Sequence, residues 1–80
     1  MNIHLIQGEF SSNDAWDLLS QMIQVKIKFH ESKIEKHASE EDIKQREEKI
    51  KYLQSQLKEA RAFFMSQGES VKINADIKIH

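Results

Sequence analysis

The sequence predicts an α+β fold of order β-α-α-β, in which a long antiparallel helical hairpin is flanked by two short terminal strands that form a small antiparallel sheet. Two observations support this prediction. Apolar residues recur at spacings of three and four through most of the chain, which is typical of amphipathic helices, and they alternate with period two near the C-terminus, which is typical of a strand. The 80 residues are expected to form a single domain, 1–80.

The N-terminal segment predicts a short strand over about residues 2–7, which ends at Gly8. Ser11 or Ser12 then provides the N-cap of a helix over about residues 12–37. Part of this helix also alternates with period two, as a strand would, but the helical periodicity continues through it and no turn residue interrupts it. The main apolar face of the predicted helix comprises Trp16, Leu19, Ile23, Ile27, His30, Ile34 and His37.

A second helix is predicted over about residues 40–67, with Ser39 as its cap and Gly68 after its end. One continuous helix is the alternative, but the second apolar face lies roughly 150° around the axis from the first, so a straight helix would separate the two faces. A turn near Ala38 brings them together instead. The buried face of the second helix comprises Ile43, Ile50, Leu53, Leu57, Ala60 and Phe64.

The C-terminal segment contains the clearest strand pattern, which covers about residues 71–79. Because the hairpin returns the chain to its starting point, we expect this strand to pair with the N-terminal one, most simply in antiparallel orientation. Trp16 and Phe64 then pack near the base of the hairpin. The apolar residues of the strand are Val71, Ile73, Ala75, Ile77 and Ile79.

The first helix carries more apolar surface than one neighbouring helix can cover. A second stripe, Leu18, Met22, Val25 and Phe29, lies roughly 130° around the axis from the first. If these four side chains stayed in water, each would forfeit about 1.5 to 3 kcal/mol of stabilising free energy compared with burial. We therefore expect a homodimer in which two hairpins form a four-helix bundle and the terminal strands share a sheet. Tyr52 and Phe63, on a side face of the second helix, are further candidate contacts with this or another protein partner.

The composition argues against several functional classes. Two glycines do not suffice for a glycine-rich phosphate loop, and the chain contains no cysteine. His30 and His37 share a helical face but stand about 10 Å apart, which is too far for one metal ion. We therefore expect a non-enzymatic interaction or scaffold protein with no catalytic residue, no cofactor and no metal. The absence of a long apolar segment predicts no membrane contact and a cytoplasmic location.

A small nucleic-acid-binding regulator is the alternative function. The net charge of −1 lacks the strong basic footprint of a general nucleic-acid binder, although a local basic surface remains a candidate for contact. The candidate residues are Lys26, Lys28, Lys33 and Lys36 of the first helix together with Lys72 and Lys78 of the last strand.

The hairpin register also predicts an electrostatic pair. A turn near residues 38 and 39 places His30 beside Glu47. A carboxylate near an imidazole favours the charged form, so we expect the pKa of His30 to lie above its ordinary value.

Overall fold

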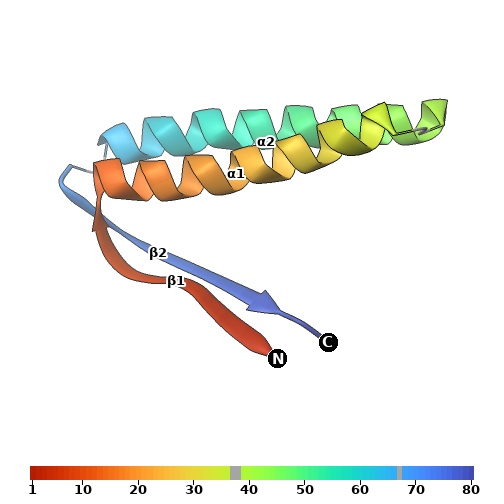
Figure 1. Cartoon of the computed structure of the whole chain (residues 1–80). Helices are drawn as coiled ribbons and strands as arrows, with labels where there is room; N and C mark the ends of the chain where they lie inside the picture. Colours follow the sequence, from red (N-terminus) through yellow and green to blue (C-terminus); the bar gives the residue numbers. More distant parts are fainter. Residues whose placement is uncertain (37–38, 67) are drawn as a thin grey trace.

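The computed structural model describes residues 1–36, 39–66 and 68–80 and confirms the predicted β-α-α-β arrangement (Figure 1). Strand β1 spans Asn2–Ser11 and is followed by helix α1, Ser12–Glu35. Helix α2 spans Glu40–Ser66, and strand β2 spans Ser70–Lys78. The two helices lie side by side as an antiparallel hairpin, and the two strands form a separate ribbon that leaves the base of the hairpin.

Serine side chains cap both helices, as the sequence predicts. The Oγ atom of Ser11 accepts a hydrogen bond from the backbone N–H of Asp14 at 3.1 Å, which identifies Ser11 rather than Ser12 as the cap of α1. Ser39 accepts in the same way from the N–H of Asp42 at 3.2 Å. Each bond satisfies a backbone donor that has no partner within the helix. The predicted turn at Ala38 lies outside the described residues.

The ribbon is a two-stranded antiparallel sheet whose register pairs Asn2 with Lys78 at one end and Ser11 with Ser70 at the other. The pairing shifts between His4 and Ile6, where Leu5 forms an extra residue in β1. A bulge of this kind bends the strand that carries it, and β1 curves in Figure 1.

Strand β1 is longer than the predicted segment 2–7. The prediction that it ends at Gly8 is wrong, because Gly8 adopts a φ of 127° within the strand and pairs with Ile73. Glycine tolerates this backbone conformation, so the residue accommodates a bend without ending the ladder. The strand continues to Ser11, where the cap of α1 begins.

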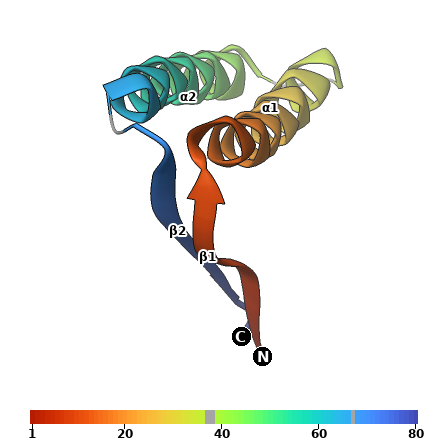
Figure 2. The same ribbon diagram turned by 90° about the vertical axis from the view of Figure 1, so that its left-hand side faces the viewer.

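The hydrophobic core lies where the ribbon joins the hairpin. Ala15, Phe64 and Val71 form its buried cluster, so α1, α2 and β2 all contribute. Trp16 packs against Phe64 with an edge-to-face geometry and a distance of 6.4 Å between ring centroids, as expected for the hairpin base. Beyond the core the ribbon diverges from the helices, with both helices on the same side of it (Figures 1 and 2).

The molecule is flat and extended. Its radius of gyration is 15.1 Å, whereas a compact chain of this length has about 12 Å. Its extents are 45 × 32 × 13 Å, so the thinnest dimension is little more than the diameter of one helix. Within the described parts of the chain, α1 and α2 are not long and apolar enough to cross a membrane.

Candidate functional site

The second apolar stripe of α1 lies open to solvent over most of its length. Ala15, one turn before Leu18, is fully buried in the core. It continues the stripe toward the hairpin base, since Ala15 and the four residues of the stripe lie within about 80° of one another around the helix. Leu18 is 36% exposed and Met22 is half-buried, whereas Val25 and Phe29, farther from the base, are 69% and 50% exposed. The ribbon covers only the first turn of the stripe because it diverges from the hairpin.

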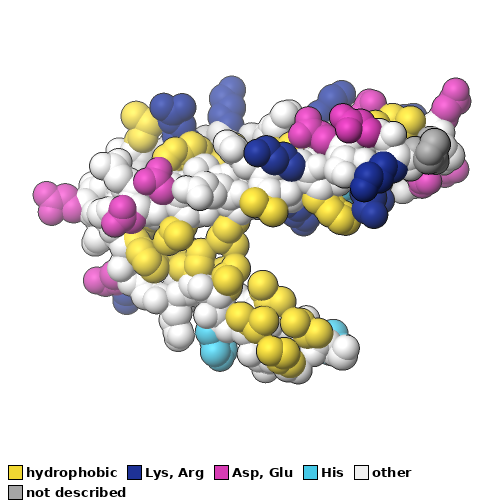
Figure 3. Space-filling model, in the orientation of Figure 1, with side chains coloured by type: hydrophobic (Ala, Val, Ile, Leu, Met, Phe, Trp, Pro, Cys, Tyr) yellow, Lys and Arg dark blue, Asp and Glu magenta, His cyan; other side chains and the backbone are white. Residues whose placement is uncertain are grey.

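A second apolar surface lies on the far half of the ribbon. Ile77 and Ile79 are 41% and 48% exposed, and Met1 is almost fully exposed. They follow along the ribbon from Val71 and Ile73, which do contact the core. Figure 3 shows a wedge-shaped space between hairpin and ribbon, with hydrophobic side chains on both of its sides. The alternation of β2 predicts an apolar face but not this exposure, which depends on the angle between ribbon and hairpin.

Tyr52 and Phe63, the other predicted contact residues, are 64% and 54% exposed on α2. Phe63 lines a shallow hollow with Gln56 and Glu59 and contacts Phe64 edge-to-face. These two residues and the stripe of α1 therefore provide separate apolar patches on the hairpin.

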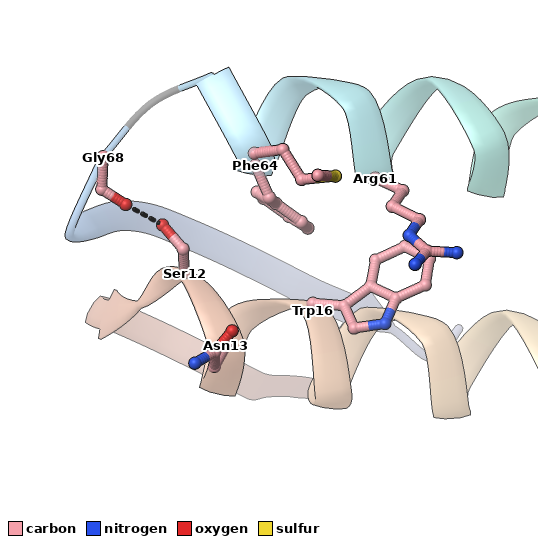
Figure 4. Close-up of a pocket in the computed structure, with 7 residues that line it drawn as sticks. Ser12, Asn13, Trp16, Arg61, Phe64 and Gly68 are labelled. Atoms are coloured by element: carbon pink, nitrogen blue, oxygen red, sulfur yellow. Dashed lines mark hydrogen bonds between the residues drawn. The ribbon is translucent and has the colours of Figure 1, made fainter.

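Another hollow lies at the hairpin base between the two helices (Figure 4). It has a volume of about 400 Å³, and its lining includes Ser12, Trp16 and Phe64. The guanidinium of Arg61 lies 5.8 Å from the Trp16 ring centre, in the geometry of a cation–π contact. Among the described residues of the lining, Arg61 is the only charged one. The hollow thus offers stacking and one positive charge, without the titratable pair that acid–base chemistry uses.

His30 is buried, and the predicted pairing with Glu47 is wrong. The Nδ1 atom of His30 lies 3.0 Å from an Nη atom of Arg46, the residue that precedes Glu47 in α2. Burial, and then the positive charges of Arg46, Lys49 and Lys26, lower the pKa of His30 below its ordinary value of 6.5. The predicted rise of the pKa is therefore wrong, because His30 is buried and its charged neighbours are cations rather than the carboxylate of Glu47.

The candidate nucleic-acid contacts belong to two separate parts of the fold. Lys26, Lys28, Lys33 and Lys36 lie in and directly after the far half of α1, whereas Lys72 and Lys78 lie on β2. Lys33 stacks over the Phe29 ring at 5.6 Å. Figure 3 shows lysine and arginine side chains interspersed with acidic ones over the hairpin face in view.

Metal ligands do not gather within the described residues, where no three His, Asp or Glu side chains are placed to hold one ion. His37, the predicted neighbour of His30 on the helical face, lies outside the described residues. Comparison of the chain with protein families, curated proteins and solved structures gives no match.

Proposed function

We propose that the protein is a non-enzymatic interaction or scaffold module that works as a homodimer, through packing between helical hairpins and a sheet shared by the terminal strands. The observation that carries this proposal is the accessible surface of a single chain, which is 6582 Å². A compact protein of 9.4 kDa exposes roughly 5,000 Å², so about 1,600 Å² is in excess.

This excess has the size of a permanent interface. Standard interfaces bury about 800 Å² for each partner, and those of obligate homodimers bury more. The surface is also of the right kind, since Val25, Phe29 and Tyr52 are at least half exposed. Among the described residues no large side chain is fully buried, so a single chain has little core of its own. A second copy would supply the missing burial.

The stripe of α1 is the best candidate for the centre of the hairpin interface. It contains four large apolar side chains in a row, and Phe29 at its far end is flanked by the cations of Lys33 and Arg46. Such a stripe can pack against its own copy across a two-fold axis, because both copies then use the same apolar patch and every contact between two different residues occurs twice. The polar side chains around it would form the rim.

Val25→Asp tests this proposal sharply. Val25 is 69% exposed in the single chain, so a carboxylate there disturbs the fold little, but it would be buried without a partner in the dimer. We expect the parent to be a dimer by light scattering and sedimentation, and the variant to dissociate with a Kd raised at least about 100-fold, since the two-fold axis doubles the cost. Phe29→Asp should act in the same way.

Gln24→Asp is the matched control, because it introduces the same charge at the adjacent exposed position on another face of α1. We expect this variant to remain a dimer. A parent that is monomeric at all accessible concentrations would contradict the proposal. A Val25→Asp variant that dimerises like the control would exclude the stripe from the interface.

A further inference from the structure

We propose that two copies of the chain join through the free edge of β2, antiparallel and centred on Asn74, to form a four-stranded sheet of order β1-β2-β2-β1. This inference rests on the proposed homodimer and specifies the surface and register of its shared sheet. The views from two directions show both helices on one side of the ribbon, and neither runs along the free edge of β2 (Figures 1 and 2).

The backbone of β2 leaves a regular row of unused hydrogen-bonding groups. The backbone N–H of Ile79 donates to the carbonyl of Met1 at 2.7 Å, and the terminal amino group of Met1 donates to the carbonyl of Ile79 at 2.8 Å. Ile79 therefore directs both backbone groups toward β1. Because this direction alternates along an antiparallel strand, the even-numbered residues direct theirs to the free edge. They are Ser70, Lys72, Asn74, Asp76 and Lys78.

Strand β1 offers no comparable edge. The extra residue at Leu5 reverses the alternation, so the residues that direct their backbone groups outward change from even to odd numbers along the strand. A bulge interrupts pairing with a further strand, and natural sheets use bulges to protect their edges. Of the two strands in the described residues, only β2 has an uninterrupted edge of nine residues, and it contains no proline.

Charge and length together select one register. Because only the even-numbered residues direct their backbone groups to the free edge, an even-numbered residue of one copy must lie opposite an even-numbered residue of the other. The two residue numbers then add to an even sum, so the two-fold axis of each possible register passes through one residue rather than between two. Centring on Asn74, the midpoint of Ser70–Lys78, pairs the whole strand and places Lys72 opposite the partner's Asp76 twice. Centring on Ala75 would place Lys72 opposite the partner's Lys78. Centring on Asp76 would oppose two carboxylates and shorten the overlap.

The same register also covers apolar surface. It keeps the odd-numbered residues of both copies on one face and places Ile77 opposite the partner's Val71. Ile77 is 41% exposed in the single chain, whereas Val71 belongs to the buried core at the hairpin base. The exposed end of each ribbon would therefore lie beside the core of the other copy. On the opposite face, Asp76 already accepts a hydrogen bond from His4 at 2.8 Å and would lie between His4 and the partner's Lys72.

Disulfide formation tests the register directly, because the chain has no cysteine. Residues opposite each other in a hydrogen-bonded pair have Cα atoms about 5.5 Å apart, which suits a disulfide. An Asn74→Cys variant should therefore become mostly covalent dimer under mild oxidation. Lys72→Cys and Asp76→Cys are the matched controls, since each would meet its own copy only at about 13 Å along the strands. We expect at least about tenfold slower cross-linking in each control, but rapid cross-linking when the two controls are mixed and allowed to exchange subunits.

The outcomes separate this inference from the proposed function when light scattering is measured on the same samples. A dimer in which Asn74→Cys fails to cross-link, or cross-links no faster than the two controls, would overturn the β2 register and leave the homodimer standing. A parent that is monomeric would overturn both.

Discussion

The Nδ1 atom of His30 lies 3.0 Å from an Nη atom of Arg46 and joins α1 to α2 in the buried seam of the hairpin. A guanidinium can only donate hydrogen bonds, so Nδ1 accepts and the imidazole is neutral, with its proton on Nε2. That Nε2 atom is buried and has no hydrogen-bond partner among the described residues. The hairpin therefore contains a neutral histidine at some energetic cost.

The burial of His30 predicts that acid destabilises the protein. Its pKa is lowered, first by burial and then by Arg46, Lys49 and Lys26, so the folded state binds a proton less readily than the unfolded state. Because the fold requires His30 to be neutral, its free energy of unfolding is unaffected by this group above about pH 6.5 and declines as the pH falls from there through the lower folded pKa. The free energy of unfolding in urea, measured from about pH 8 to 5, should decline in the parent more steeply than in His30→Leu.

An NMR titration identifies the cause of this decline. The pKa of His30 should lie below 6.5 and should rise in Arg46→Gln, because one neighbouring positive charge is removed. Glu47→Gln, at the adjacent position, is the control and should produce no rise. A His30 pKa at or above 6.5 in the parent would refute the prediction.

His30→Leu should stabilise the protein at pH 7.5. The substitution keeps an apolar side chain of similar size in the seam and removes a buried N–H without a partner, which costs about 1 to 3 kcal/mol. Arg46 is partly exposed and can turn to water. We expect a gain of about 1 kcal/mol, equivalent to a rise of roughly 4 to 8 °C in Tm. His30→Gln keeps a polar group in the seam and should give no gain; a loss of stability in His30→Leu would show that the Arg46 contact outweighs the unpaired N–H.

Gly8→Ala should destabilise the ribbon through the backbone alone. Gly8 has a φ of 127°, and among the described residues no heavy atom outside Gly8 and its two chain neighbours lies within 4 Å of the place where a Cβ would be. The substitution therefore meets no steric obstacle but forces alanine into a conformation that costs about 1 to 3 kcal/mol. Gln7→Ala, at the preceding exposed position, should change the free energy of unfolding by less than about 0.5 kcal/mol. Equal effects of the two substitutions, measured by urea unfolding, would argue against a strained bend at Gly8.

Local patterns in the sequence were sufficient for the elements and their order. Helical spacing is a property of neighbours within one turn, and the capping bonds of Ser11 and Ser39 each join residues only three apart, so these features could be predicted from the sequence. The alternation of β2 could be predicted in the same way, because it too is a local pattern. The contact between Trp16 and Phe64 could also be predicted, because an antiparallel hairpin returns the chain to its base.

Features that depend on the distance or angle between elements could not be predicted in this way. The packing of α1 against α2 buried His30 and placed Arg46 beside it, and both effects lower the pKa that the sequence predicted to rise. The strand continued through Gly8 because a partner strand was there to pair with it.

The sequence by itself determined that α1 carries an apolar stripe which α2 cannot cover, because that is a matter of angles around one helix. Only the tertiary structure decided that the ribbon leaves this stripe open. The ribbon diverges from the hairpin beyond the small core of Ala15, Phe64 and Val71, and so both the stripe and the far end of β2 face solvent. That divergence is set by packing at one end of the molecule, between residues far apart in the chain, and no local pattern encodes it.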